Sequence, residues 1–234
     1  MVIIALSVLS GCAGSINAIE NRNMTVKVNM TETIFLDAEN LANGHNIYVR
    51  VRNTSDVQAI DFESLLKAQL TQRGLNVVND PKIANFRVQA NVLCMSKEKR
   101  GLTADGAMAG GFGGALTGLY ASRGLAGNIA GAGIGGLVGA GVGALAGSLI
   151  HVDTYFGTID VQIQEHSDNK VTGVLQTDAA QGSATGLHTT REVDTNWQTY
   201  RTRMVAYAKQ TNIDENEAAN AIATKLAIQV ANVF

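Results

Sequence analysis

The sequence predicts an α+β domain, similar to α/β folds, that is discontinuous in the chain and carries an inserted transmembrane helical hairpin with a glycine zipper. Three observations predict this fold class. Apolar residues alternate over several short segments, as in half-buried strands, and recur at helical spacing in two others. Of 25 glycines in 234 residues, 17 fall between Gly101 and Ile150. The hydrophobic content of 46% and the net charge of −2 argue against wholesale disorder and against a charged tail.

The first 11 residues form an uncharged apolar run that ends at Cys12. Such a run is typical of an export signal, but the basic residues that normally open one are missing, so we expect the true start to lie upstream of Met1. Residues 9–12, Leu-Ser-Gly-Cys, resemble the bacterial lipobox, whose cysteine receives a diacylglycerol. We therefore expect a signal peptide over 1–11, a lipid on Cys12 and a tether over 12–24. A buried cysteine after an N-terminal helix is the alternative.

Ala13 bears on the destination of this lipoprotein. An aspartate after the lipidated cysteine would resemble the bacterial inner-membrane retention signal, and alanine stands there instead. We therefore expect sorting to the outer membrane, with the acyl chains as a stable anchor.

The segment before the glycine-rich stretch contains two strands and a helix. Alternation predicts strands around 47–51 and over 85–95, and turn-forming residues occupy 53–56. Apolar residues at 62, 65, 66 and 70 mark one face of a helix that Gly74 ends. Cys94 continues the apolar positions of the second strand, so we predict a buried thiol and not a reactive one.

The glycine-rich insert has a four-residue period in two series. The first is Gly106, Gly110, Gly114 and Gly118, and the second is Gly127, Gly131, Gly135, Gly139, Gly143 and Gly147. Small residues at every fourth position let helix backbones approach closely, a pattern common between membrane helices. These ten glycines are therefore predicted to pack helices in a membrane or an oligomer.

An energy comparison favours lipid over water for this insert. Residues 125–150 are uncharged and contain nine glycines, each of which costs a helix in water about 1 kcal/mol relative to alanine. In lipid the backbone must hydrogen-bond internally, so the coil no longer competes. We therefore expect residues 104–150 to form a hairpin that inserts by packing on itself and on copies of itself. A flexible glycine-alanine loop or a buried soluble hairpin is the alternative.

The segment after the insert contains strands and a final helix. Alternation predicts strands over 159–163, 171–177 and 198–208. Asp214 and Glu217 resemble a capping box, and an apolar stripe at helical spacing follows as far as Val233. Neither flank has enough elements to form a complete domain. We therefore expect 25–103 and 151–234 to form one discontinuous soluble domain.

The sequence offers no constellation for catalysis. The four histidines lie far apart without metal-ligand spacing, and nucleophile-elbow and Walker motifs are absent. A loose G-x-G-x-x-A at 141–146 lies inside the zipper with no strand before it. Aromatic residues are few and no basic patch is evident in the sequence, which argues against nucleic acid. We therefore expect neither an enzyme nor a bound cofactor or metal.

Several segments in order along the mature chain resemble the TraT family of outer-membrane lipoproteins. The resemblance is strongest over 30–36, 53–56, 88–93, 160–163 and 200–205. It implies a surface-exposed, homo-oligomeric protein, expected here as a ring, whose lipid is carried by Cys12 and whose glycine helices insert in the outer membrane. None of these segments is a catalytic signature, so the weight of the resemblance comes from their order and coverage.

The resemblance further implies surface exclusion, which reduces conjugative plasmid transfer between like cells, together with complement resistance. The partners would then include conjugation components of the donor-cell surface. A structural envelope lipoprotein is one alternative. An oligomeric outer-membrane pore is the other, although residues 125–150 offer only Asn128 and Ser148 as a polar lining.

Overall fold

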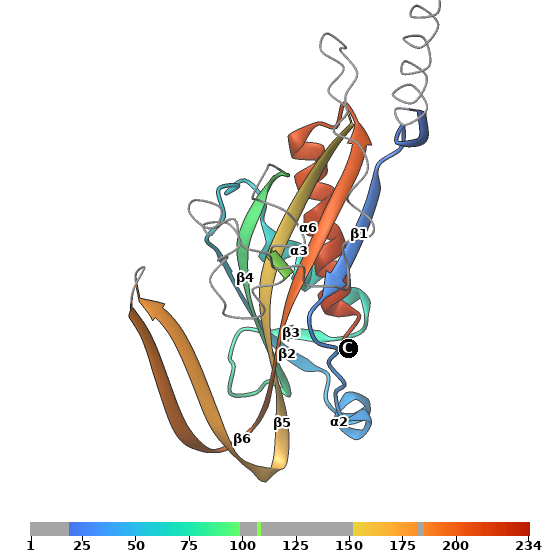
Figure 1. Ribbon diagram of the computed structural model, residues 1–234. Coiled ribbons are helices and arrows are strands. Elements are labelled where there is room, and N and C mark those ends of the chain that lie inside the picture. The colour runs from blue at the N-terminus through green and yellow to red at the C-terminus, as the bar shows by residue number, and fades with distance from the viewer. Residues whose placement is uncertain (1–18, 99–106, 109–151, 182–184) are drawn as a thin grey trace, which may run out of the picture.

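The computed structural model describes residues 19–98, 107–108, 152–181 and 185–234, with the backbone alone over 175–181 and 185–191. The elements in chain order are β1 (Thr25–Met30), α2 (Ala38–Asn43), β2 (Asn46–Asn53), α3 (Phe62–Gln72), β3 (Asn76–Val78), β4 (Phe86–Lys97), β5 (Val152–Gln181), β6 (Thr185–Thr211) and α6 (Glu215–Ala231) (Figure 1).

The strands form one mixed sheet in the order β1-β6-β5-β4-β2-β3. β2 runs parallel to both β3 and β4, whereas the β1–β6, β4–β5 and β5–β6 pairs are antiparallel. The pairing of β4 with β5 joins a strand that precedes residues 99–151 to a strand that follows them. Both flanks of the glycine-rich segment therefore contribute to the same sheet.

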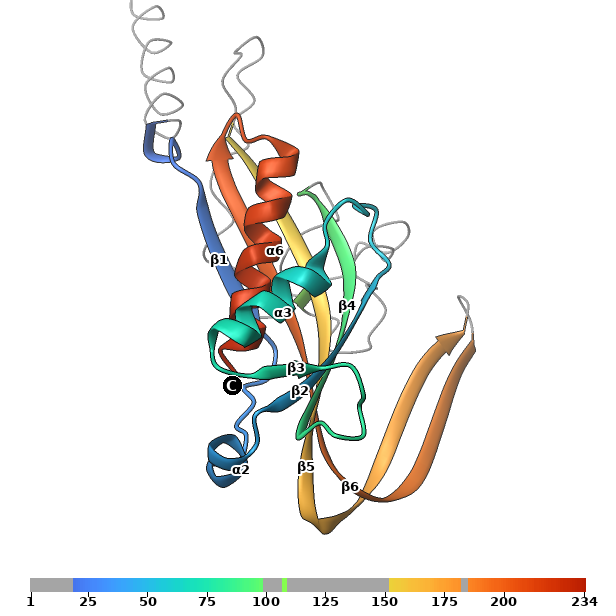
Figure 2. The same cartoon turned by 180° about the vertical axis from the view of Figure 1, so that it is seen from behind.

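Two helices cover one face of this sheet (Figure 2). α6 packs on β1, β4, β5 and β6, and α3 packs on β2, β3 and α6. Alternate residues of the strands, such as Val49, Val88 and Val161, point into the core beneath the helices. The side chain of Asp214 accepts a hydrogen bond from the Glu217 amide at 3.0 Å, which confirms the predicted start of the last helix. α3 ends at Gln72, and Gly74 follows with a φ of +88°, a conformation that suits glycine.

A glycine of β5 lets α6 approach the sheet closely. A Cβ atom built on Gly157 would lie 2.6 Å from Cγ2 of Ile222, which is closer than van der Waals contact allows. Gly157 occupies the core face of β5 between Tyr155 and Ile159. Since any side chain at this position would push against α6, the glycine sets the helix-to-sheet distance.

β5 and β6 continue beyond the body of the sheet as a curled two-stranded ribbon (Figure 1). β4 pairs with β5 only as far as Phe86 opposite Glu165. Past a register shift between His166 and Val171, β5 and β6 pair only with each other within the described part of the chain, ending with Gln181 opposite Thr185. The predicted strands 159–163, 171–177 and 198–208 are thus parts of two much longer strands.

The predicted fold class is wrong, because the described residues form mostly a curled mixed sheet and include no transmembrane hairpin. No helix among the described residues is both long and apolar enough to cross a membrane. Most of the predicted hairpin 104–150 lies outside the described residues. Where it is described, Ala107 is 2% exposed and packs against Phe156 and Val205 of the sheet. This small residue thus packs on protein strands, and its apolar character does not require lipid.

A bulge changes the position predicted for Cys94. The register of β4 shifts between Val92 and Cys94, which interrupts the alternation of faces. Met95 consequently takes the core position at 3% exposure, and Cys94 lies half-buried beside the small cluster of Ala107, Phe156 and Val205. The sequence pattern placed the thiol on the wrong face, because alternation cannot reveal a bulge.

Candidate functional site

Eight polar side chains form two rows across the face of the sheet opposite α3 and α6. From β2 through β4 and β5 to β6, the paired residues are Arg50, Gln89, Gln162 and Arg201 in one row, and Arg52, Asn91, Asp160 and Arg203 in the other. Each row begins and ends with an arginine. We call these eight residues the arginine face. Four arginines against one aspartate give it three excess positive charges, on a chain whose net charge is −2.

Arg203 and Asp160 form a buried ion pair at one end of the second row. Nε of Arg203 donates to Oδ1 of Asp160 at 2.6 Å, and Nη2 donates to Oδ2 at 2.8 Å. Nη1 of the same guanidinium donates to the backbone carbonyl of Ala107 at 3.3 Å. Arg203 is only 1% exposed. The pair therefore also anchors residue 107 on the sheet.

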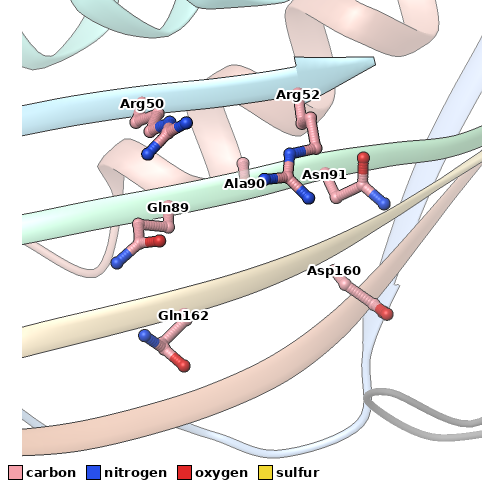
Figure 3. A pocket seen from close by; sticks show the side chains of 7 residues that line it. All are labelled: Arg50, Arg52, Gln89, Ala90, Asn91, Asp160 and Gln162. Carbon is pink, nitrogen blue, oxygen red and sulfur yellow. The ribbon is translucent and has the colours of Figure 1, made fainter. Parts of the chain in front are cut away.

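The other end of the arginine face is accessible. A hollow of about 230 Å³ is lined there by side chains from β2, β4 and β5, which are drawn as sticks in Figure 3. Arg50, Arg52 and Gln89 are exposed there. Neither Arg50 nor Arg52 makes a side-chain hydrogen bond or ion pair with another described residue. Because the Asp160 carboxylate is already held by Arg203, the charge of the two free guanidinium groups is not neutralised within the described structure.

A second hollow of about 500 Å³ adjoins the first and shares Gln162 with it. Nε of Arg201 donates to Oε1 of Gln162 at 3.0 Å, so this arginine lies at the boundary of the two hollows. The second hollow runs from the sheet onto the base of the ribbon and is lined there by residues such as Val171, Thr195 and Trp197. Together the two hollows form one concave surface across three strands and the ribbon.

The indole of Trp197 is already engaged by its neighbours. The Arg87 guanidinium lies 3.6 Å from the centre of the ring, in cation–π geometry, and Nη2 of Arg87 also donates to the Pro81 carbonyl at 2.7 Å. The His166 ring meets Trp197 edge-on, with centroids 5.1 Å apart. These contacts fix the indole where the ribbon leaves the body of the sheet.

A buried carboxylate on the opposite face holds α2 against the sheet. Glu165 is 3% exposed and accepts hydrogen bonds from the Asp37 amide at 3.0 Å and from Nδ2 of Asn40 at 2.9 Å. It also accepts from the Tyr200 hydroxyl at 3.1 Å. Burial, the neighbouring Glu165 charge and this hydrogen bond together raise the pKa of Tyr200 to about 12. The Glu165 carboxylate therefore has a structural role, because its hydrogen bonds hold the chain before β2 against the sheet.

Comparison with known proteins decides the family. The family model of the enterobacterial TraT complement resistance protein matches residues 23–234. A TraT complement resistance protein of Escherichia coli is 32% identical over 249 residues, which cover 100% of this chain and 95% of the relative. The chain belongs to the TraT family. This result confirms the resemblance found in the sequence.

Further members of the TraT family match in the same way. A TraT complement resistance protein of Escherichia coli strain K12 is 32% identical over 231 residues, covering 97% of this chain and 93% of the relative. One from Wigglesworthia glossinidia brevipalpis is 28% identical over 99 residues, covering 42% of this chain and 40% of the relative. The full-length matches include the four strands that build the arginine face.

The residues predicted as sites in this member of the TraT family all lie outside the described residues. They are the lipidation residue Cys12 and the packing residues Gly106, Gly110, Gly114, Gly118, Gly127, Gly131, Gly135, Gly139, Gly143 and Gly147. Of the described residues, no group of three or more His, Cys, Asp or Glu is placed to hold a metal ion.

Sequence reasoning missed the arginine face, although part of its signal was present. The alternation of polar and apolar residues places Arg50 and Arg52 on the polar face of one strand, and Arg201 and Arg203 on the polar face of another. What was missing was the pairing of their strands. The linear sequence shows no basic patch, but the fold brings the arginines of β2 and β6 onto one face of the sheet.

Proposed function

We propose that this protein protects the cell against complement as a lipoprotein of the bacterial outer membrane. The observation that carries the proposal is the match to the TraT complement resistance family over residues 23–234, together with relatives of that name matched along their whole length. Protection would be exerted by binding or by a barrier effect and not by turnover. In support, the one carboxylate of the arginine face, Asp160, is held in a structural ion pair.

Anchoring through Cys12 is part of the same proposal. The uncharged apolar run before Leu-Ser-Gly-Cys supports lipidation, and Ala13 supports transport to the outer membrane. Acyl chains contribute about 0.8 kcal/mol per buried methylene, so more than one chain gives stable attachment. The soluble sheet would then be tethered near the membrane, where it can be exposed at the cell surface and assemble with copies of itself.

Serum survival tests the proposal directly. A serum-sensitive enterobacterial strain that expresses the protein should survive normal serum better than the strain with an empty vector. The difference should disappear in heat-inactivated serum, where both strains survive. A Cys12→Ser variant should lose the protection if the lipid is needed. Equal killing of both strains, with the protein shown by fractionation to be in the outer membrane, would contradict the proposal.

We propose surface exclusion as a second and more specific function of this protein. It rests on the resemblance of segments such as 30–36 and 200–205 to the TraT family. Expression in a plasmid-free recipient should lower the frequency of conjugation from a donor that carries the related plasmid, and leave transfer from an unrelated donor unchanged. Unchanged transfer from both donors would remove surface exclusion and leave complement resistance as the function.

A further inference from the structure

We infer that the arginine face is a binding site for an acidic oligosaccharide. The inference goes beyond complement resistance and does not depend on it. It starts from two arginines, Arg50 and Arg52, that are exposed and have no side-chain partner among the described residues. They lie on one strand two residues apart, so their backbones are separated by about 6.6 Å. Two cations thus point from neighbouring positions into the same hollow (Figure 3).

The choice of side chains indicates an oxyanion as the charged part of the ligand. The eight positions of the arginine face include four arginines and no lysine. A guanidinium is a planar fork that binds the two oxygens of a carboxylate, sulfate or phosphate at once, whereas an ammonium acts as a point charge. Arg203 already shows this geometry with Asp160, so the same sheet surface accommodates a two-oxygen contact.

The amides between the arginines indicate the neutral part of the ligand. Gln89, Asn91 and Gln162 separate the terminal arginines of the two rows. Each amide both donates and accepts, which matches a hydroxyl group that does the same. Ala90 is the one apolar residue that lines the hollow of Figure 3. A ligand that alternates anionic groups with hydroxyls fits this lining better than an acyl chain or an apolar peptide side chain.

The size of the surface favours a chain of sugars over a single ion. Arg50 and Arg201 stand at opposite ends of a row that crosses three strand spacings, or about 14 Å. The second hollow continues this surface past Gln162, where Thr195 and Thr199 add hydroxyl groups. An extended acidic oligosaccharide could therefore contact cations at both ends of the row and amides and hydroxyls along its length.

Nucleic acid fits the same charge less well. Single strands bind through aromatic rings on which bases stack. Trp197 lines the second hollow, but Arg87 lies over its ring and His166 meets it in a T-shaped contact. Stacking of a base on the face of the ring that Arg87 covers would first require Arg87 to leave its cation–π contact and its hydrogen bond to Pro81. The described surface thus favours sugars over bases.

Binding by the full-length protein purified in detergent tests the inference. The probes are heparin oligosaccharides, which carry sulfates, and oligogalacturonate, which carries carboxylates. Dextran oligosaccharides serve as the neutral control and a DNA oligonucleotide as the non-sugar polyanion. We expect saturable binding of at least one acidic oligosaccharide, weaker binding of the DNA and none of dextran. The stronger of the two acidic probes would identify the preferred oxyanion.

Three double variants separate a specific site from attraction to general charge. Arg50→Gln with Arg52→Gln should weaken binding of the acidic oligosaccharide by tenfold or more, on the order expected for losing hydrogen bonds to charged groups. The charge-matched control, Lys82→Gln with Lys225→Gln, changes exposed lysines outside the arginine face and should leave binding within about twofold of the wild type. Arg50→Lys with Arg52→Lys keeps the charge and should restore only part of the affinity.

Three results would overturn the inference. One is the absence of binding to both acidic oligosaccharides. A second is equal weakening by Arg50→Gln with Arg52→Gln and by the control, Lys82→Gln with Lys225→Gln, which would show attraction to net charge alone. The third is DNA binding as tight as that of the better oligosaccharide. Because all of the substituted side chains are exposed, circular dichroism of each variant should match the wild type.

Discussion

Arg203 and Asp160 face each other across β6 and β5 in a two-bond ion pair that is almost fully buried under residue 107. Asp160→Asn would leave the Arg203 cation in the protein interior without its counter-charge. Removing one partner of a buried pair costs about 3 to 5 kcal/mol. We expect chemical denaturation to show a loss of that size in the free energy of unfolding. Asp168→Asn, whose carboxylate is fully exposed, is the matched control and should change stability by less than about 0.5 kcal/mol.

The same pair allows a second comparison. Asp160→Leu combined with Arg203→Met removes both charges and keeps apolar volume, and such replacements are often neutral or stabilising. The double variant should therefore be more stable than Asp160→Asn alone. If Asp160→Asn unfolds at the wild-type denaturant concentration, the pair does not hold the sheet surface together.

Gly157 and Ile222 set the distance between β5 and α6. Gly157→Ala would place a methyl group 2.6 Å from Cγ2 of Ile222, so either α6 or the side chain must move. Overpacking of this kind costs about 1 to 3 kcal/mol, measured as the free energy of unfolding. Gly173→Ala is the control, because a Cβ there meets no atom within 4 Å. Adding Ile222→Leu, which removes the β-branch, should recover part of the loss, and full additivity of the two changes would argue against the contact.

Tyr200 should remain protonated at a pH where an ordinary tyrosine ionises. Its pKa is raised to about 12, chiefly by burial and then by Glu165. Since the folded pKa lies above the unfolded value of about 10, the stabilisation is complete below pH 10 and is lost as the pH rises towards 12. Phenolate absorbance can be titrated in the wild type and in Tyr200→Phe. The difference between the two curves should show a single step near pH 12, which belongs to Tyr200. The free energy of unfolding of Tyr200→Phe should fall less between pH 10 and 12 than that of the wild type. A step near pH 10 in the difference curve would contradict the contact with Glu165.

Local patterns predicted those elements whose signals are local. The caps and apolar faces of the helices beginning at Phe62 and Glu215 can be read within a few turns of chain, and the strand at Asn46–Asn53 shows plain alternation. The long ribbon could not be predicted in this way. Polar residues 166–170 interrupt the alternation, and only pairing with β6 carries β5 past the register shift that follows His166.

The arginine face shows why the candidate site could not be predicted. Arg50 and Arg201 are separated by most of the chain, and they lie in one row only because β4 and β5 come between their strands. The four-residue glycine period led to the prediction of a transmembrane hairpin, and the described residues contain none. Close packing through small residues explains a four-residue repeat in water as well as in lipid, and Ala107 packs on strands. Periodicity reveals that something packs closely but does not identify the partner.

The thiol of Cys94 should react slowly in the folded protein. It is half-buried beside Phe156 and Val205, and burial raises its pKa, an effect that the Ser96 hydroxyl partly opposes. Because the thiolate is the reactive form, alkylation by iodoacetamide at pH 8 should be at least about tenfold slower than in urea, where burial is lost. Ser96→Ala removes the hydrogen bond that lowers the pKa, so this variant should react more slowly still when folded and equally fast in urea. Cys12→Ser in both proteins ensures that only Cys94 is measured, and equal folded and unfolded rates would show that the bulge of β4 leaves the thiol exposed.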